Sequence, residues 1–503
     1  MKAAKRFLSI IALLMAVTLL FSACNNGSSK DKKDDKANAS DVADGDNADG
    51  DNTDGDNADG EDADGDSTAS GKTTSKKGSK NSKSSKKSGT SASSGKTTWD
   101  KDIYGSMPDS VKKKEVHILM WRNFTKTEKA LVDAYQKKTG VKVRLTMTTE
   151  HDYATKLVSL ISAKDSPDVV MLSSTTFPGV AVKSLKTLDA KKFRLDDACW
   201  SKTHMDPYRI NGKYMSVAIA GSWSCEDLNY VTYYNTKVLK DAGITVMPYT
   251  LYKQGKWDWA KQKEYATKIA SRGKAAGLGL QTYDLFMLSA GADFCSYDGK
   301  QFTNNISSLN GNSTLIKAWT TLTDMRQAGL TAKFDFQGLP KGTAGMMSAI
   351  SYGLYKDGDW FKASDVNDKS GLVEAVPMAG PSASTSYTPL APKTWGVAKG
   401  SDNVEGAAYF LRYWLDPSNC NMASTFYTKQ FKEVFDKVTA KGSKRKVVVS
   451  SGAIDYVRSW KYDTICTEIY NSSTQNVLSK VNSVKNDIDL SIKQANKGLS
   501  RIK

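Results

Sequence analysis

Apolar runs of strand length alternate with helical segments near the start of the long hydrophobic part of the chain. The pattern predicts a strand at 116–121, a helix at 127–138, a strand at 141–147, a helix at 153–163 and a strand at 169–172. The order strand, helix, strand, helix, strand is typical of a parallel sheet covered by helices. We therefore expect an α/β fold.

Ligands of open α/β sheets bind beside the carboxyl ends of the strands. In this chain, Trp121, Arg122 and Asn123 follow the first strand, and Ser173 and Ser174 follow the third. An indole ring offers flat apolar area, while guanidinium, amide and hydroxyl groups give directional hydrogen bonds. These five residues are therefore candidate ligand contacts, with a core tryptophan, exposed loop residues and helix-capping serines as the alternative reading.

The first 24 residues have the pattern of an export signal. A basic start is followed by an apolar stretch at 7–20 that is short for a membrane span, and the small residues Ser22 and Ala23 precede Cys24. This arrangement resembles the lipobox of bacterial lipoproteins, which implies removal of residues 1–23 and lipidation of Cys24, including palmitate. Ordinary secretion with an incidental cysteine is the alternative.

Residues 25–98 cannot build a hydrophobic core. An acidic repeat rich in Asp, Gly, Asn and Ala is followed by a block of Ser, Gly, Thr and Lys, and aromatic residues are absent from both. Such composition predicts a disordered segment, because too little apolar surface is buried to offset chain entropy. We expect 24–98 to be a flexible tether between a lipidated Cys24 and a folded domain at 99–503.

The charge and the rare residue types restrict the function of the folded domain. The chain has 71 Lys and Arg against 54 Asp and Glu, and residues 1–98 hold 15 of each sign, so the whole excess of +17 belongs to the folded domain. Export argues against a nucleic-acid partner, and solvated lysines are the default reading of such an excess. Three histidines and five widely spaced cysteines after Cys24 predict neither a metal site nor a bound cofactor.

Several stretches, in order, resemble the extracellular solute-binding proteins of ABC importers, family 1, the sugar-binding group that includes maltose-binding protein. The stretches that carry the resemblance are KALVDAY (129–135) with TGVKV (139–143), YATKL (153–157), DSPDVVM (165–171), YYNTK (233–237) with AGI (242–244), WDW (257–259), the segment 342–347, WGVAKG (395–400) and AAYFL (407–411). The resemblance extends from about residue 114 to 415.

The resemblance implies a type II periplasmic-binding-protein fold with two α/β lobes, a hinge and a cleft between the lobes. The first lobe would comprise about 114–226 and 380–417, and the second about 227–379 and 418–503. A ligand that contacts both lobes would favour the closed form of such a hinge.

The resemblance also implies positions for aromatic ligand contacts. Trp395 precedes the glycine of the closing strand and is the foremost candidate, and Trp223 lies just before the first crossing between lobes. Tyr352 follows the segment 342–347 and is a further candidate contact, although the sequence around it departs from the family pattern. Trp360 is a second candidate for the same ligand contact.

The predicted function is that of a monomeric, lipid-anchored receptor on the outer side of the cell membrane. It would capture a carbohydrate, in particular an oligosaccharide, and deliver it to the permease subunits of an ABC importer without catalysis. A cell-surface glycoside hydrolase and an adhesin for anionic glycans or wall polymers are the alternatives. The basic excess slightly favours uronic-acid-type ligands.

Overall fold

The computed structural model describes residues 107–502 except 227, 308, 312 and 367–371. The export signal, Cys24, the tether and the first residues of the expected folded domain lie outside the described residues. The described residues belong to one compact unit.

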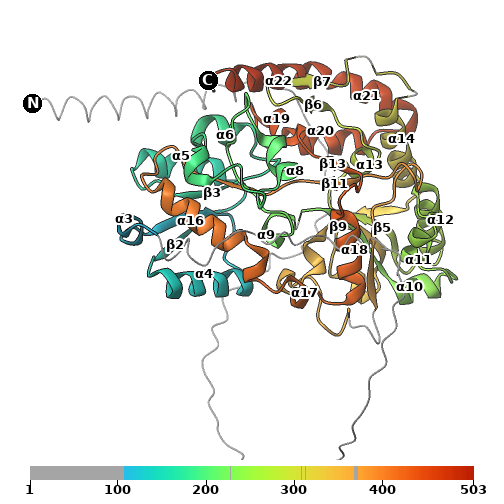
Figure 1. Ribbon diagram of the computed structural model, residues 1–503. Helices are drawn as coiled ribbons and strands as arrows, with labels where there is room; N and C mark the ends of the chain where they lie inside the picture. The colour runs from blue at the N-terminus through green and yellow to red at the C-terminus, as the bar shows by residue number, and fades with distance from the viewer. Residues whose placement is uncertain (1–106, 227, 308, 312, 367–371, 503) are drawn as a thin grey trace, which may run out of the picture. The chain divides into compact units, whose positions relative to one another are not determined.

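A four-stranded sheet forms the first lobe, with strand order β12-β3-β1-β2 (Figure 1). The strands are β1 (Val116–Met120), β2 (Val143–Met147), β3 (Val169–Leu172) and β12 (Thr394–Gly396). β1 runs parallel to both β2 and β3, whereas β12 is antiparallel to β3. The helices α4 (Lys126–Thr139) and α5 (Tyr153–Ser162) connect the parallel strands. The predicted alternation of strands and helices at 116–172 is therefore confirmed.

Local signals explain where α4 begins and ends. The Thr125 side chain accepts from the Glu128 amide at 3.2 Å, and the Glu128 carboxylate accepts from the Thr125 amide at 2.9 Å. This capping box satisfies amides that have no partner within the helix. Gly140 ends the helix with φ +76°, a conformation that glycine adopts without a Cβ penalty.

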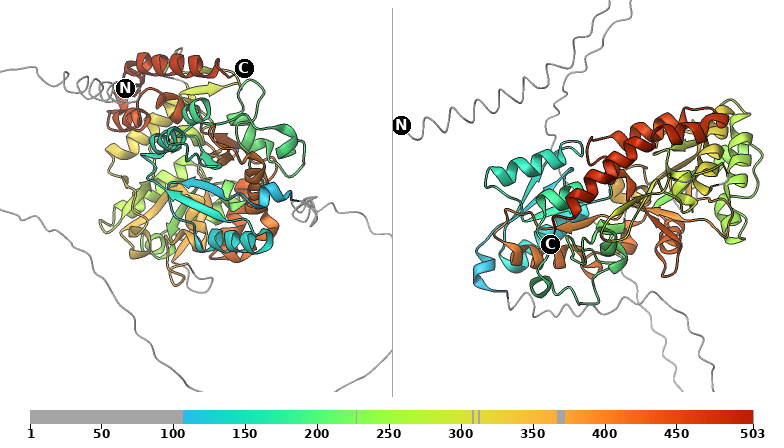
Figure 2. Two further views of the ribbon diagram at one scale, coloured as in Figure 1. Left: turned by 90° about the vertical axis from the view of Figure 1, so that its left-hand side faces the viewer. Right: turned by 90° about the horizontal axis from the view of Figure 1, so that it is seen from above.

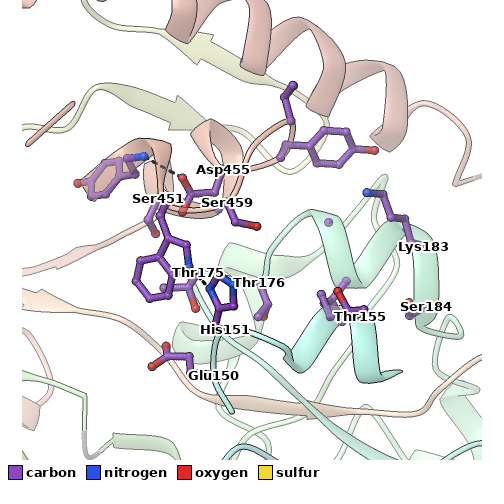
Figure 3. Close-up of a pocket in the computed structure, with 18 of the residues that line it drawn as sticks. Glu150, His151, Thr155, Thr175, Thr176, Lys183, Ser184, Ser451, Asp455 and Ser459 are labelled. Atoms are coloured by element: carbon purple, nitrogen blue, oxygen red, sulfur yellow. Dashed lines mark hydrogen bonds between the residues drawn. The ribbon is translucent and has the colours of Figure 1, made fainter. Parts of the chain in front are cut away.

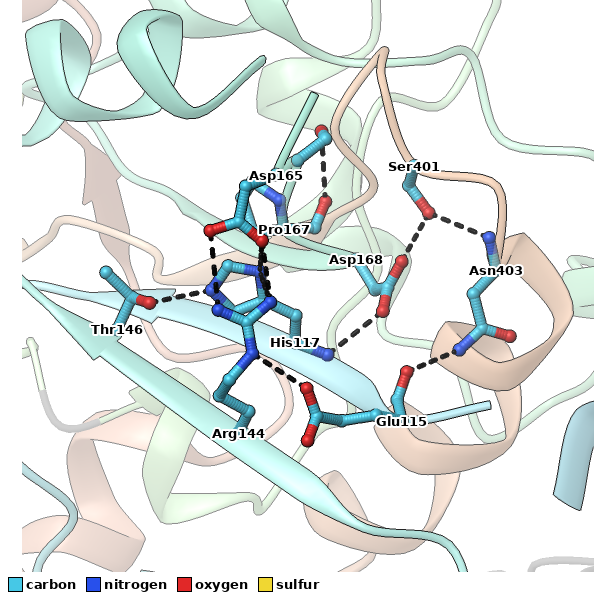
Figure 4. A network of polar contacts seen from close by, with 10 residues as sticks. Glu115, His117, Arg144, Thr146, Asp165, Pro167, Asp168, Ser401 and Asn403 are labelled. Carbon is cyan, nitrogen blue, oxygen red and sulfur yellow. Dashed lines mark hydrogen bonds and ion pairs between the residues drawn. The ribbon is translucent and has the colours of Figure 1, made fainter. Parts of the chain in front are cut away.

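A polar network joins the amino-terminal edge of this sheet (Figure 4). The buried His117 ring contacts Thr146 Oγ1 at 2.7 Å, and Arg144 pairs with Asp165 at 2.7 Å. The buried Asp168 carboxylate accepts from the His117 amide at 2.9 Å and from the Ser401 hydroxyl at 2.6 Å. Burial lowers the pKa of His117, with the charge of Arg144 as the second cause, so the ring is neutral at pH 7. The network fixes the register of the three parallel strands.

The second lobe contains a five-stranded mixed sheet with strand order β10-β4-β9-β5-β8. Its strands are β4 (Tyr230–Asn235), β5 (Ala276–Leu280), β8 (Thr331–Lys333), β9 (Ala344–Ile350) and β10 (Val373–Pro377). β5 is parallel to β8 and β9, and β4 is antiparallel to β9 and β10. Helices that pack on this sheet include α10 (Thr236–Asp241), α11 (Pro248–Lys253), α12 (Trp259–Ala270), α15 (Gly338–Lys341) and α18 (Lys429–Thr439).

The carboxyl-terminal helices pack against elements of both lobes (Figure 2). They are α19 (Ser450–Ile454), α20 (Lys461–Tyr470), α21 (Val477–Ser483) and α22 (Lys485–Leu499). α20 and α21 pack on α14 (Thr314–Gln327), while α22 packs on β7 (Phe302–Asn304) and on α6 (Gly179–Ser184) of the first lobe. The chain between α19 and α20 is thereby brought opposite α5 and α6.

The other elements are short, except for one helix that covers the first lobe. That helix, α16 (Val404–Leu415), packs on α4 and β1. The short elements are α3 (Asp109–Lys112), α7 (Ala190–Phe193), α8 (Lys202–Met205), α9 (Trp223–Glu226), α13 (Leu285–Ser289), α17 (Met422–Thr425), β6 (Cys295–Tyr297), β11 (Thr388–Leu390) and β13 (Arg445–Val447). No helix among the described residues is long and apolar enough to cross a membrane.

Candidate functional site

A cleft of about 330 Å³ lies between the first lobe and the chain segment around α19 and α20 (Figure 3). This volume is within the range of small-molecule sites. The first lobe contributes Glu150, His151, Thr155, Thr175, Thr176 and Lys183, and the opposite wall contributes Ser451, Asp455, Tyr456, Trp460, Tyr462 and Asp463.

Aromatic rings line the mouth of the cleft. Trp460 is 45 % exposed, and its ring lies nearly parallel to that of His151, with 6.0 Å between the ring centroids and 14° between the planes. Trp460 Nε1 donates to His151 Nδ1 at 2.6 Å, which joins the two walls. Trp460 also has φ +62°, a sparsely populated conformation for a bulky side chain. On the same wall, the Tyr456 ring lies 5.1 Å from Lys183 Nζ.

Three carboxylates line the cleft, and the protein raises the pKa of each. Burial raises the pKa of Asp455 to about 6, although its Oδ1 accepts from the Tyr462 amide at 2.8 Å. Desolvation by the cleft walls raises the pKa of Glu150, and the charge of Asp463 raises it further, while Lys393 acts in the opposite direction. Desolvation is also the main cause of the raised pKa of Asp463. Hydrogen bonds donated by a ligand would stabilise the ionised form of each of these carboxylates.

A close backbone contact joins α19 to the loop after β3. The Gly452 amide donates to the Ser174 carbonyl at 2.9 Å. A Cβ at Gly452 would lie 1.9 Å from the Phe177 carbonyl oxygen and 2.4 Å from that of Ser174. Only glycine fits this approach, so the position sets the distance between the two walls.

A buried carboxylate from the second lobe supports the wall that carries Tyr462. Asp284 follows β5, is 5 % exposed, and its Oδ2 accepts from the Tyr462 hydroxyl at 2.8 Å. Burial raises the pKa of Asp284. Tyr230, the first residue of β4, has a pKa raised by burial and then by the charges of Asp284 and Glu150. The second lobe therefore supports the cleft wall through the contact between Asp284 and Tyr462.

The loop after β3, which contains the predicted contacts Ser173 and Ser174, lies beside the cleft. Thr175 and Thr176 line the cleft, whereas Ser173 and Ser174 are 1 % and 4 % exposed behind them. The Ser173 hydroxyl lies 2.9 Å from Thr175 Oγ1. The two serines thus position the loop, and ligand contact by their side chains remains a prediction that their burial does not support.

The loop after β1 does not line the cleft. Trp121 packs edge-on against Tyr153 with 5.5 Å between the ring centroids. The Arg122 guanidinium donates two hydrogen bonds to the buried Glu128 carboxylate, at 2.5 and 2.9 Å. Arg122 therefore supports the residue that caps α4. Asn123 is exposed, and its Oδ1 accepts from the Phe124 amide. The expectation that these residues contact ligand does not fit these placements.

Trp395 lies in the core of the first lobe. Its side chain is 0 % exposed, and its ring packs against Trp414 with 4.5 Å between the centroids. An indole without exposed surface has no face to offer to a ligand, so the expected stacking role does not fit this structure. The sequence signal was a tryptophan on a short strand, and β12 is buried between β3 and the segment at Val217.

Tyr352 and Trp360 contact each other away from the cleft. Their rings are 6.2 Å apart, and Trp360 also stacks on Phe336 at 5.5 Å and packs near Tyr233. These rings form an aromatic cluster on the second lobe instead of a wall of the cleft. Trp223 lies in α9, and its side chain is outside the described part of the structure, so its predicted contact stays a prediction.

The opposite wall of the cleft was missed because the family resemblance ended near residue 415. Asp455, Tyr456, Trp460, Tyr462 and Asp463 all follow that point. The signal that could have found them is compositional: two aspartates bracket three aromatic residues within the nine residues 455–463.

Comparison with known proteins identifies the family. The family model for the bacterial extracellular solute-binding protein matches residues 121–419, more than half of the chain. No curated protein sequence matches the chain at a significant level.

Solved structures share the fold at low sequence identity. An ABC substrate-binding protein of Listeria monocytogenes in complex with cycloalternan aligns with a TM-score of 0.54 and 18 % identity, over 77 % of this chain and 99 % of that one. The galacto-N-biose-/lacto-N-biose I-binding protein of an ABC transporter from Bifidobacterium longum, in complex with lacto-N-biose, aligns with a TM-score of 0.57 and 14 % identity, over 76 % and 97 %. The cyclic alpha-maltosyl-1,6-maltose binding protein of Arthrobacter globiformis gives 0.54 and 18 %, over 77 % and 99 %.

These alignments confirm the expected fold class, an α/β protein with the two-lobe, type II periplasmic-binding architecture. The matched family model covers the first sheet except β1, most of the second lobe and the helix α16. The chain belongs to the bacterial extracellular solute-binding protein family.

Proposed function

We propose that this protein captures a carbohydrate in the cleft between α5, α6 and the α19–α20 segment and delivers it to an ABC importer. The observation that carries the proposal is the combination of a half-exposed Trp460 with three carboxylates and several hydroxyls on facing walls. Sugar rings present apolar C–H faces that pack on indole, and hydroxyls that donate to carboxylates. The solved relatives that are named for oligosaccharides support the same ligand class.

The proposed contacts differ from those that the sequence indicated. Trp460 and Tyr456 would supply the aromatic surface, and Glu150, Asp455 and Asp463 would accept hydrogen bonds from sugar hydroxyls. Because the cleft walls come from both ends of the folded region, a ligand bound to both would stabilise one hinge state over others. The protein would act by binding and release, without a catalytic step.

We also propose that Cys24 is lipidated and that residues 24–98 tether the receptor near its permease at the outer face of the cell membrane. Tethering raises the effective concentration of the receptor beside its transporter. The proposed lobes comprise about 114–226 with 380–417 and about 227–379 with 418–503. Lipid analysis of the mature protein and of Cys24→Ala would test the anchor separately from ligand binding.

A thermal-shift screen against mono- and oligosaccharides tests the proposed ligand class. A ligand that binds only the folded state stabilises it by mass action and so raises Tm. At a free ligand concentration of about 100 times Kd, the free energy of unfolding increases by about 2.7 kcal/mol. We expect one glycan class to raise Tm in the protein and in Leu490→Ala, a control at an exposed apolar residue of α22 that does not line the cleft. The shift should disappear in Trp460→Ala. An unchanged shift in that variant would remove the cleft from the proposal.

A further inference from the structure

The charge of the cleft is opposite to that of the whole protein. The cleft is lined by Glu150, Asp455 and Asp463 against one lysine, Lys183, in a chain with a net charge of +17. Among the described residues, no ion pair within 4 Å involves any of these three carboxylates. An acidic cleft on a basic protein is a local feature that overall composition does not explain.

Carboxylates outside the cleft commonly have a lysine partner. Lys129 pairs with Asp133 at 3.0 Å on α4, and Lys432 pairs with Asp436 at 2.6 Å on α18. Both are helical pairs at i, i+4 spacing, the arrangement that lets surface charges neutralise each other. The cleft carboxylates lack such a partner although lysines are abundant in the chain.

The basic side chains near the cleft contact other groups, and the carboxylates in the cleft lining outnumber the lysines. Lys461 pairs with Asp487 at 3.0 Å, and Lys183 lies over the Tyr456 ring. His151 Nδ1 accepts a hydrogen bond from Trp460 Nε1. Lys393 is buried near Glu150 and offsets part of its charge.

A buried hydroxyl in the wall of the cleft lacks a partner. Ser451 lines the cleft and is 6 % exposed, and its hydroxyl has no hydrogen-bond partner among the described residues. A buried polar group without a partner is costly, so this position favours a ligand that forms a hydrogen bond with the hydroxyl.

We infer that the ligand of this cleft is an amine-bearing, cationic carbohydrate, such as an oligosaccharide that contains glucosamine with a free amino group. An ammonium group donates three hydrogen bonds and carries the charge that three unpaired carboxylates require. The Trp460 ring adds a surface for the sugar face and for a nearby cation. This inference rests on the proposed carbohydrate-binding function and opposes the uronic-acid-type ligands that the basic excess suggested.

A metal ion is a weaker fit to the same charges. Within the described residues, no group of three or more His, Cys, Asp or Glu side chains is arranged to hold a metal ion. The carboxylates are distributed along the walls of an open cleft, as an extended ligand with several donor groups requires.

Matched pairs of sugars test the inference. The panel compares glucosamine with glucose, galactosamine with galactose, and glucosamine oligomers with their N-acetylated and hydroxyl counterparts in several linkages, with spermidine as a cation without a sugar ring. Isothermal titration at pH 7 and low salt should show that the amine member of a pair binds at least tenfold tighter. Added salt should reduce this preference, because it screens the charges.

Charge-neutral variants separate the electrostatic effect from folding. The triple variant with Glu150→Gln, Asp455→Asn and Asp463→Asn should reduce the preference for the amine to within about twofold, whereas Asp133→Asn, which removes a charge that does not line the cleft, should retain it. Circular dichroism melting would establish that each variant is folded.

Each outcome decides between the two proposals. Equal or tighter binding of neutral sugars overturns the inference of a cationic ligand and leaves the proposed function intact. Binding of spermidine without any sugar overturns the proposed function and this inference with it, as does the absence of binding to every probe. A preference for the amine that persists in the triple variant also overturns the inference, since the charge would then lie outside these carboxylates.

Discussion

Replacement of Asp455 by Asn should stabilise the protein at neutral pH in the absence of ligand. Burial raises the pKa of Asp455 from 3.8 to about 6, so the folded state holds this proton more tightly than the unfolded state does. The ionised carboxylate therefore opposes folding above pH 6. Asparagine removes the charge and keeps an Oδ1 that can accept from the Tyr462 amide, a bond of 2.8 Å in the structure.

The size of the effect follows from the shift in pKa. A shift of about two units corresponds to at most about 3 kcal/mol at 1.36 kcal/mol per unit. Asp455 is partly exposed, so solvent screening reduces this ceiling, and we expect about 1 kcal/mol. For a domain of this size the gain corresponds to an increase in Tm of about 1–2 °C.

The contribution of Asp455 to stability depends on pH. Between pH 4 and 6 the folded state binds more protons at this site than the unfolded state does, so stability of the parent protein falls as pH rises through this window. The gain from Asp455→Asn should be absent below pH 4, grow between pH 4 and 6, and be constant above pH 6. Tm measured by circular dichroism at four pH values across this range provides the assay.

A second aspartate serves as a control of opposite sign. The exposed Asp189 accepts from the Lys191 and Lys192 amides at the start of α7, and the Lys192 amide is the main cause of its lowered pKa. Its contribution to stability is present at neutral pH and is lost as pH falls, so Asp189→Asn should lower Tm at pH 7. A lower Tm for Asp455→Asn at pH 7, or a gain of the same size at pH 4, would refute the reasoning.

Two further substitutions test the packing that positions the cleft. Trp395→Ala should cost about 3–5 kcal/mol, because the side chain is 0 % exposed, and should lower Tm strongly while the folded fraction still binds ligand; loss of binding with unchanged Tm would contradict its core position. Gly452→Ala should lower both Tm and ligand affinity, since the new Cβ would lie 1.9 Å from the Phe177 carbonyl oxygen, and a variant that melts and binds like the parent would contradict the close approach.

Hydrophobic periodicity predicted the three parallel strands of the first lobe and the helices between them because these elements are local. The apolar run of β1, the capping signals of α4 and the buried run of β3 are each set by neighbours in the sequence. The pattern also indicated the loop after β3 as a candidate part of the site. In the structure, Thr175 of this loop lines the cleft.

The rest of the site depends on contacts between distant segments. Trp460 meets His151 across 309 positions of sequence, and Tyr462 meets Asp284 across 178. No local pattern encodes such a meeting. The same limitation explains Trp395: a tryptophan on a short strand is compatible with a cleft or a core, and only the packing of Trp414 against it decides.

Isothermal titration of the protein with the glycan that gives the largest thermal shift tests the central claim most directly. The account predicts saturable binding of one glycan per protein, recovery of the glycan unchanged after incubation, and loss of the binding heat in Trp460→Ala. Binding heat that is the same in Trp460→Ala, or conversion of the glycan to shorter products, would contradict a receptor that holds its ligand in this cleft.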